Sequence, residues 1–252
     1  MSPADTAPML ASMLSALSQQ VPGQEAKEPW TTQRRLVQHA ERCLQYVPRL
    51  DATQPEVGDS IVNIAGIHHE QNNMHGAEEM YLRALRGYKE VLDPKHITTL
   101  ATLATLYNLG IFYSHQGKTQ EAEVMYLRAL RGYGEVLGSK HTSTLDTVNN
   151  LANLYADQGK TKEAEEMYLR ALEGKEEALG PKHTSTLTTL YSLVIFYSDQ
   201  GRIQETEQMF AQVLEGYQNV EGDHEAIIWY LREQLGTLRA GRQSSSQYLQ
   251  GE

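Results

Sequence analysis

Apolar residues recur along much of this chain at intervals of three and four positions, which is the spacing of one face of an α-helix. In one stretch the apolar face includes Leu151 and Leu154. It stops at Gly159 and resumes with Tyr168 and Leu172. This pattern predicts a helix, a tight turn and a second helix, and its recurrence predicts an all-α protein.

The helix pair belongs to an internal repeat. The segment MYLRALRGY occurs at residues 80–88 and again at 125–133, and MYLRALEGK follows at 167–175. Four aligned methionines stand 45, 42 and 42 residues apart, and the longer interval contains the stutter TLATLATL, close to one added helical turn. One helix pair cannot bury its own apolar face, so nearly identical units are expected to pack on one another. The anchors are Met80, Met125, Met167 and Met209.

Two features of each unit predict how its helices meet. A residue that tolerates a left-handed backbone stands at each turn, namely Asn72, Gly117, Gly159 and Gly201. Small residues face aromatic ones, which predicts a close approach of helices with rings filling the space beside them. The pairs are Ala77 and Tyr81, Ala122 and Tyr126, Ala164 and Tyr168, and Thr206 and Phe210.

Glycines also stand inside the second helix of every unit, where each costs up to about 1 kcal/mol relative to alanine. Four of them amount to about 4 kcal/mol, a large share of a typical domain's stability. We therefore expect a neighbouring helix to approach closely at these positions, with shared ancestry of the units as the alternative. The four are Gly87, Gly132, Gly174 and Gly216.

The linkers LDPKH, LGSKH and LGPKH separate the units and are followed by threonine and serine. Pro94, Pro181 and the glycines should end the second helices, and the Ser/Thr residues should cap the next ones. The linker histidines His96, His141 and His183 recur about two helix widths apart, too far to share a metal ion. They are predicted to cap helices or to pack under the loop.

These positions resemble the tetratricopeptide repeat signature. The resemblance implies an α-solenoid of about four helix-turn-helix repeats over residues 57–225, with N- and C-terminal capping helices. The matching residues of the second unit are Leu109, Gly110, Tyr113, Gly117, Ala122, Tyr126 and Ala129; those of the third are Leu151, Ala152, Tyr155, Gly159, Ala164, Tyr168 and Ala171.

The 42-residue period and the linker LGPKHTSTL resemble the kinesin light chain subtype of this repeat. The segments TSTLDTVNNLANLYADQGK and EAEEMYLRALEG resemble still more closely the C-terminal repeat arrays of fungal NLR-like proteins. Outside the repeats we expect an arm with a short amphipathic helix and a linker at 1–29, and a packing helix at 30–56. A capping helix at 226–240 and a disordered tail at 241–252 complete the predicted organisation.

Composition and charge narrow the function. The net charge of −10 and the pI of about 5.4 argue against a nucleic-acid partner. The chain has no apolar stretch that could span a membrane and no secretion signal, so we expect a cytoplasmic protein without membrane insertion. Its single cysteine, Cys43, excludes an internal disulfide and a cysteine-based zinc site.

Two motifs resemble known ligand-binding sequences, but the residues around them argue against these functions. GKT occurs at 117–119 and 159–161, but a phosphate-binding loop needs a glycine where Phe112 and Leu154 stand. HHEQNNMH at 68–75 suggests a zinc-protease helix, but Asn73 replaces its second histidine. His68 aligns with Tyr113, Tyr155 and Tyr197 of the other units, so it is predicted to be a packed side chain and not a metal ligand. We therefore expect no cofactor, no metal site, no catalytic residue and no enzyme activity.

The resemblance implies that the first helices of the pairs line a concave groove that binds a peptide or helix. Those helices carry acidic residues but no Lys or Arg, unlike the basic groove of kinesin light chains, so a neutral to basic partner is expected. Their amides could grip a peptide backbone. The predicted groove residues are Asp59, Asn63, Ile67, Glu70, Tyr107, Asn108, Ile111, His115, Asp146, Asn149, Asn150, Asn153, Asp157, Tyr191, Ser192, Ile195 and Asp199.

Three functions remain open from the sequence. The first is a non-catalytic protein-interaction scaffold. The second is a regulatory sensor module derived from an NLR-like protein without its nucleotide-binding switch, which would self-associate or bind a separate chain. The third is an accessory protein of a metabolic or biosynthetic pathway, which would require a small-molecule pocket.

Overall fold

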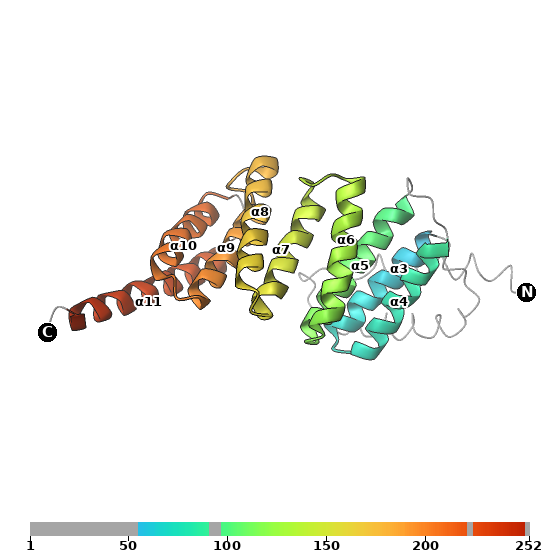
Figure 1. The fold of residues 1–252 in the computed structure, drawn as a ribbon, viewed down its shortest axis with the longest axis horizontal. Coiled ribbons are helices and arrows are strands. Elements are labelled where there is room, and N and C mark those ends of the chain that lie inside the picture. Colours follow the sequence, from blue (N-terminus) through green and yellow to red (C-terminus); the bar gives the residue numbers. More distant parts are fainter. Residues whose placement is uncertain (1–54, 91–96, 221–223, 250–252) are drawn as a thin grey trace, which may run out of the picture. The chain divides into compact units, whose positions relative to one another are not determined.

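The computed structural model describes residues 55–90, 97–220 and 224–249. Every element within these ranges is an α-helix, and consecutive helices form antiparallel pairs (Figure 1). The helices are α3 (Pro55–Glu70), α4 (Met74–Glu90), α5 (Ile97–His115), α6 (Thr119–Val136), α7 (Thr142–Asp157), α8 (Thr161–Leu179), α9 (Thr184–Asp199), α10 (Ile203–Gln218) and α11 (Glu225–Leu249).

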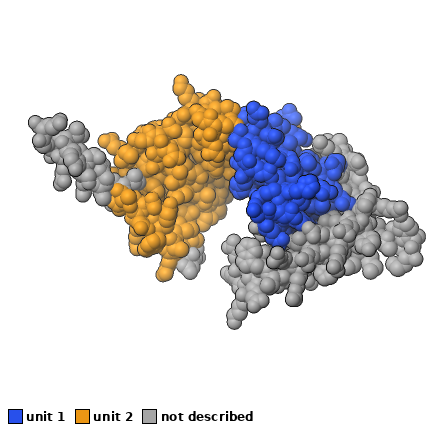
Figure 2. Space-filling view, turned by 90° about the horizontal axis from the view of Figure 1, so that it is seen from below, with its two compact units in different colours: residues 1–132 blue, residues 133–252 orange. Residues whose placement is uncertain are grey.

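The chain divides into two compact units, residues 1–132 and 133–252, which Figure 2 shows in different colours. In the first unit, α4 packs between α3 and α5, and α3 also contacts α5. In the second unit, α8 packs on α7 and α9, and α10 packs on α9 and α11. Each helix in these sets contacts the helices next to it in sequence, which is the packing expected of stacked repeats.

The turns between paired helices have the predicted backbone conformation. Asn72 has a φ of 60°, and Gly117, Gly159 and Gly201 have φ between 70° and 71°. The extra residues of the second repeat lengthen its first helix, as the segment TLATLATL predicted. Helix α5 has 19 residues, whereas the equivalent α7 and α9 each have 16.

The glycines of the second helices lie against leucines of the first helices. A Cβ added at Gly174 would lie 2.6 Å from Leu145 Cδ2, closer than real Cβ atoms approach. The equivalent Gly132 faces Leu103, and Gly216 faces Leu187, with the same overlap. The predicted close approach is confirmed at these three positions. The surroundings of Gly87 lie outside the described residues.

The first helices of the later repeats are capped differently from the prediction. The N-cap residues are His141 and His183, not serine or threonine. The Nδ1 atom of His141 accepts a hydrogen bond from the Ser143 amide at 3.2 Å, and that of His183 accepts from the Ser185 amide at 3.1 Å. The Ser/Thr capping prediction is therefore wrong here, and the predicted capping role of the linker histidines is confirmed. His96 lies outside the described residues.

The predicted small and aromatic positions form the core. Ala122, Ala164, Tyr126 and Tyr168 are all buried. His68 is also buried and its Nδ1 lies 2.9 Å from Asn73 Nδ2, which confirms that it packs at the turn.

A polar contact joins the first two repeats at the turn before α6. Tyr113 Oη donates a hydrogen bond to Glu78 Oε1 at 3.0 Å. Lys118 Nζ lies 3.6 Å from Glu78 Oε2 and 5.3 Å from the centre of the Tyr113 ring. Lys118 is the lysine of the first GKT segment, so this residue has a structural role between repeats.

The same contact joins the last two repeats. Tyr197 Oη donates to Glu165 Oε1 at 2.8 Å, and Arg202 Nη1 lies 2.6 Å from the same oxygen. The guanidinium of Arg202 also lies over the Tyr197 ring, 3.9 Å from its centre. The hydrogen bonds from Arg202 and then Tyr197 lower the pKa of the Glu165 carboxyl below its usual range.

This shift predicts acid sensitivity. A carboxyl whose pKa is lowered by folding stabilises the protein above the pKa of the unfolded chain, and the gain is lost as pH falls through the folded pKa. We expect Glu165→Gln to lower the free energy of unfolding by about 1 kcal/mol at pH 7 and to flatten its decline in acid. Urea unfolding between pH 7 and pH 3 checks this. Glu173→Gln, at an exposed position of α8, is the control, and parallel pH profiles of E165Q and wild type would contradict the assignment.

A buried lysine distinguishes the third repeat. Lys175 is 2% exposed and stands where the second and fourth repeats have Tyr133 and Tyr217. Its Nζ lies 2.6 Å from Asp146 Oδ1 of α7 and donates to Thr189 Oγ1 of α9 at 2.9 Å. A buried ammonium is costly unless it is paired and hydrogen-bonded, so this network holds three helices together.

The predicted organisation of the two ends of the chain can be compared with the structure only in part. The arm at 1–29 lies outside the described residues, as does the packing helix at 30–56 apart from Pro55 and Glu56, which begin α3. At the other end, α11 continues beyond the capping helix predicted at 226–240 and reaches Leu249. Residues 241–249 contain no proline, so the helix can extend through these polar residues.

Candidate functional site

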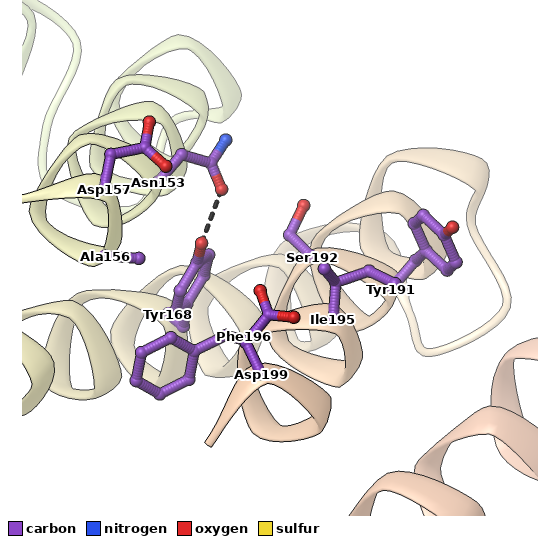
Figure 3. Close-up of a pocket in the computed structure, with 9 residues that line it drawn as sticks. All are labelled: Asn153, Ala156, Asp157, Tyr168, Tyr191, Ser192, Ile195, Phe196 and Asp199. Carbon is purple, nitrogen blue, oxygen red and sulfur yellow. Dashed lines mark hydrogen bonds between the residues drawn. The ribbon is translucent and has the colours of Figure 1, made fainter. Parts of the chain in front are cut away.

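A pocket of about 250 Å³ lies between α7 and α9 of the second unit, with one wall from α8 (Figure 3). Its residues occur three and four positions apart on α7 and α9, so each helix presents one face to the cavity. We call it the α7–α9 pocket, and its lining is Asn153, Ala156, Asp157, Tyr168, Tyr191, Ser192, Ile195, Phe196 and Asp199.

A partly buried hydrogen bond lies on one side of this pocket. Tyr168 Oη donates to Asn153 Oδ1 at 2.6 Å, as the dashed line in Figure 3 marks. The Tyr168 side chain is almost wholly buried, and burial raises the pKa of its phenol, with further contributions from Asp157 and Asp199. The phenol therefore stays a neutral donor, and Asn153 is oriented with its oxygen toward it.

Tyr191 forms the other side of the pocket. Its ring meets Phe210 edge-on, with centroids 6.1 Å apart. Its hydroxyl lies 3.5 Å from that of Tyr230 on α11. Burial and this contact raise the pKa of Tyr191 to about 12. Helix α11 thus extends the polar and aromatic surface beyond the first helices of the repeats.

The two aspartates give the pocket its charge. Asp157 is at the end of α7 and Asp199 at the end of α9, and both side chains are exposed. Among the described residues, no Lys or Arg lines the pocket. An unpaired acidic site of this kind favours a cationic group on whatever binds there.

The structure gathers six of the predicted groove residues around this pocket and separates others from it. Asp146 is paired with Lys175 of α8, so its charge is already compensated although α7 itself carries no Lys or Arg. Asn149 is 8% exposed and Ile67 7%, so both offer little surface to a partner. The six are Asn153, Asp157, Tyr191, Ser192, Ile195 and Asp199.

The remaining predicted residues have varied surroundings. In the first unit, His115 is exposed, and its Nδ1 lies 3.3 Å from His69 Nε2. The side chain of Glu70 lies outside the described residues. Exposed positions are Asp59 and Asn63, and half-buried ones are Tyr107, Asn108, Ile111 and Asn150.

Sequence reasoning missed three residues of the pocket. Ala156 and Phe196 lie three and four positions after Asn153 and Ser192, so helical spacing could have identified them. Tyr168 was assigned only to the core because it belongs to the repeat signature. Its hydroxyl nonetheless reaches the pocket while its ring packs.

Metal sites and membrane-spanning helices have requirements that the described residues do not meet. Within the ranges that the structure describes, no three His, Cys, Asp or Glu side chains are grouped as a metal site would require. None of the helices placed by the structure has an apolar stretch long enough to cross a lipid bilayer.

Family models of the tetratricopeptide repeat match most of the helical region. One matches residues 57–98, and another matches residues 102–177 and 146–219. Among curated proteins, none shows significant sequence similarity to the chain.

Solved structures share the fold at low sequence identity. BtubC (BKLC) from P. vanneervenii is 21% identical with a TM-score of 0.66, over 91% of this chain and 82% of that one. A putative kinesin light chain with nearly identical TPR-like repeats from Podospora anserina is 20% identical with a TM-score of 0.66, over 86% and 96% of the two chains. PilF from Pseudomonas aeruginosa is 15% identical with a TM-score of 0.57, over 96% and 90%.

The matched models, the left-handed turns and the sequential helix pairs agree with one another. They confirm the predicted fold class, which is an all-α solenoid of tetratricopeptide repeats. Repeats of this type typically mediate protein–protein interaction and are generally non-catalytic. The chain belongs to the tetratricopeptide repeat family.

Proposed function

We propose that the chain is a non-catalytic interaction scaffold whose second unit binds an extended peptide or a helix of a partner protein along α7 and α9. The observation that carries this proposal is the α7–α9 pocket, where six residues predicted to contact a partner surround one cavity. The lining combines aromatic rings, an oriented amide and two carboxylates, which suits a polypeptide with both apolar and polar groups.

The contacts that hold the pocket helices in place support this proposal alongside the family membership. The helices that line the pocket are held by buried leucine–glycine contacts and by the Lys175 network, so the site is formed before a partner arrives. Binding to a preformed surface needs little backbone rearrangement and keeps the entropic cost of association low. A neutral to basic partner is favoured because the exposed carboxylates are not paired within the pocket.

We expect Ser192→Arg to reduce recovery of the partner at least about tenfold, because a large cation would fill the pocket and pair with its aspartates. The measurement uses the full chain as bait in a cell extract, with quantitative mass spectrometry of the recovered proteins. Leu169→Arg is the matched variant, since it adds the same side chain on α8, where Leu169 is 46% exposed and lines no part of the pocket. Circular dichroism establishes that both variants fold.

A second candidate is a sensor-like module of the NLR type that binds itself or a separate chain through its second helices. The exposed leucines Leu127 of α6 and Leu169 of α8 favour it, because they recur at equivalent positions without being covered. It predicts the reverse result in the same experiment: Leu169→Arg would abolish recovery and Ser192→Arg would leave it intact. That outcome would replace the pocket with the second-helix surface as the site of interaction.

A further inference from the structure

The lining of the α7–α9 pocket combines apolar side chains with two carboxylates. Ala156, Ile195 and Phe196 supply aliphatic and aromatic surface, and Figure 3 shows them in the same cavity as Asp157 and Asp199. An apolar wall that leads to carboxylates matches a side chain with a hydrocarbon stem and a cationic head. Lysine and arginine are the two amino acids with this construction.

The two carboxylates of the pocket differ in their pairing from two other carboxylates of the second unit. Asp146 pairs with Lys175, and Glu165 pairs with Arg202. Among the ion pairs found in the described ranges, none involves Asp157 or Asp199, although both lie close enough to the Tyr168 phenol to act on it electrostatically. Within the described ranges, the carboxylates of Asp157 and Asp199 therefore have no internal ion pair to compete with an external cation.

Apart from the donor nitrogen of the Asn153 amide, the polar groups of the lining also favour a donor on the ligand. The Asn153 oxygen already receives the Tyr168 proton at 2.6 Å, and the Ser192 hydroxyl donates to the Thr188 carbonyl at 3.2 Å. The Ser192 oxygen and the two carboxylates keep lone pairs directed toward solvent or ligand. An ammonium or guanidinium supplies only donors, so it complements this set, whereas a carboxylate or phosphate would meet repulsion.

From these contacts we infer that the α7–α9 pocket selects one lysine or arginine side chain of the bound segment. The stem lies along Ile195 and Phe196, and the cationic head lies between Asp157 and Asp199. The inference rests on the proposed function, because it assigns the pocket to one residue of the same partner segment. It adds the chemical class of that residue and the two side chains that select it.

The test begins with a display library of random eight-residue peptides selected on the immobilised full chain. We expect Lys and Arg to be enriched at a single position of the selected peptides. The most enriched peptide is then synthesised with Lys, norleucine or Glu at that position, and its affinity is measured by fluorescence anisotropy. The Lys peptide should bind about tenfold more tightly than the norleucine peptide, the size expected for one charge-assisted contact.

Paired variants assign this preference to the pocket. Asp157→Asn with Asp199→Asn should remove the tenfold difference and leave binding of the norleucine peptide nearly unchanged. Glu173→Gln with Glu176→Gln removes the same amount of charge at exposed positions of α8 outside the pocket and should preserve the preference. Equal loss in both double variants would show a general charge effect and would overturn the inference.

The outcomes separate this inference from the proposed function. Selected peptides that lose binding in Ser192→Arg but show no Lys or Arg preference would overturn the inference and leave the peptide site in place. Selected peptides that ignore Ser192→Arg, or a failure to select any peptide, would overturn both. A Lys or Arg preference that disappears only in the Asp157 and Asp199 double variant would support both.

Discussion

Asp146→Ala is expected to lower the free energy of unfolding by about 2–3 kcal/mol, because it leaves the buried Lys175 ammonium without its carboxylate. Lys175 Nζ lies 2.6 Å from Asp146 Oδ1, and its other polar partners within the described ranges are the Thr189 hydroxyl and the Ser185 carbonyl. The Asp146 side chain is partly exposed, so the expected loss falls below that of a fully buried pair. Urea unfolding followed by circular dichroism measures the change.

The control for this prediction is the removal of both charges. Asp146→Ala combined with Lys175→Met should recover most of the lost stability, since an apolar side chain of similar length fills the space without an unpaired charge. Lys175→Tyr, which restores the residue of the second and fourth repeats, provides an independent comparison. A change below about 0.5 kcal/mol in Asp146→Ala, the range of ordinary surface substitutions, would show that the ion pair contributes little.

Gly174→Ala is expected to destabilise the protein by about 1–3 kcal/mol although alanine is the better helix former. The added Cβ would lie 2.6 Å from Leu145 Cδ2, and Leu145 is buried with little room to move. The overlap should therefore outweigh a gain of about 1 kcal/mol in helix propensity. The same urea titration measures the result, and Gly216→Ala should behave alike because it faces Leu187.

A glycine without neighbours provides the comparison. Gly236 lies within α11 and a Cβ there would meet nothing within 4 Å, so Gly236→Ala should stabilise the helix by up to about 1 kcal/mol. Opposite signs at Gly174 and Gly236 would show that packing retains the repeated glycines. Stabilisation at both positions would instead favour shared ancestry of the units, the alternative that the sequence left open.

The sequence predicted the parts of the fold that every repeat needs. The turn glycines, the small residues beside rings and the glycines of the second helices recur in each unit, so each prediction rested on several copies of one constraint. The left-handed turn at Asn72 followed from the same alignment despite its different residue. Repetition separates the residues required by stacking from those that vary freely.

Other features escaped prediction because they depend on how far a side chain reaches. The first helices carry no Lys or Arg of their own, but Lys175 reaches Asp146 from α8. The helix caps were assigned to Ser and Thr by their usual preference, yet an imidazole nitrogen of His141 accepts the bond instead. Neither contact follows from periodicity, which locates a backbone position and leaves the terminal atoms of long side chains undetermined.

The candidate site contains residues that the sequence predicted and others that it missed. Asn153, Asp157 and Ser192 were predicted from the resemblance to tetratricopeptide arrays, in which the first helices line the groove, and the structure places them around one pocket. Tyr168 was missed as a lining residue because its ring fulfils the core pattern while its hydroxyl extends into the cavity. Their role in binding stays a prediction until the experiments on Ser192, Asp157 and Asp199 are done.

The leucine–glycine contact repeats at intervals of 42 residues, at Leu103 with Gly132, Leu145 with Gly174 and Leu187 with Gly216. Any in-frame duplication of one such interval would carry both halves of the contact and the linker histidine that starts the next helix. A helix pair added or removed in this register would therefore keep the close contact between its own two helices. The number of such pairs can thus change without altering the contact on which each pair depends.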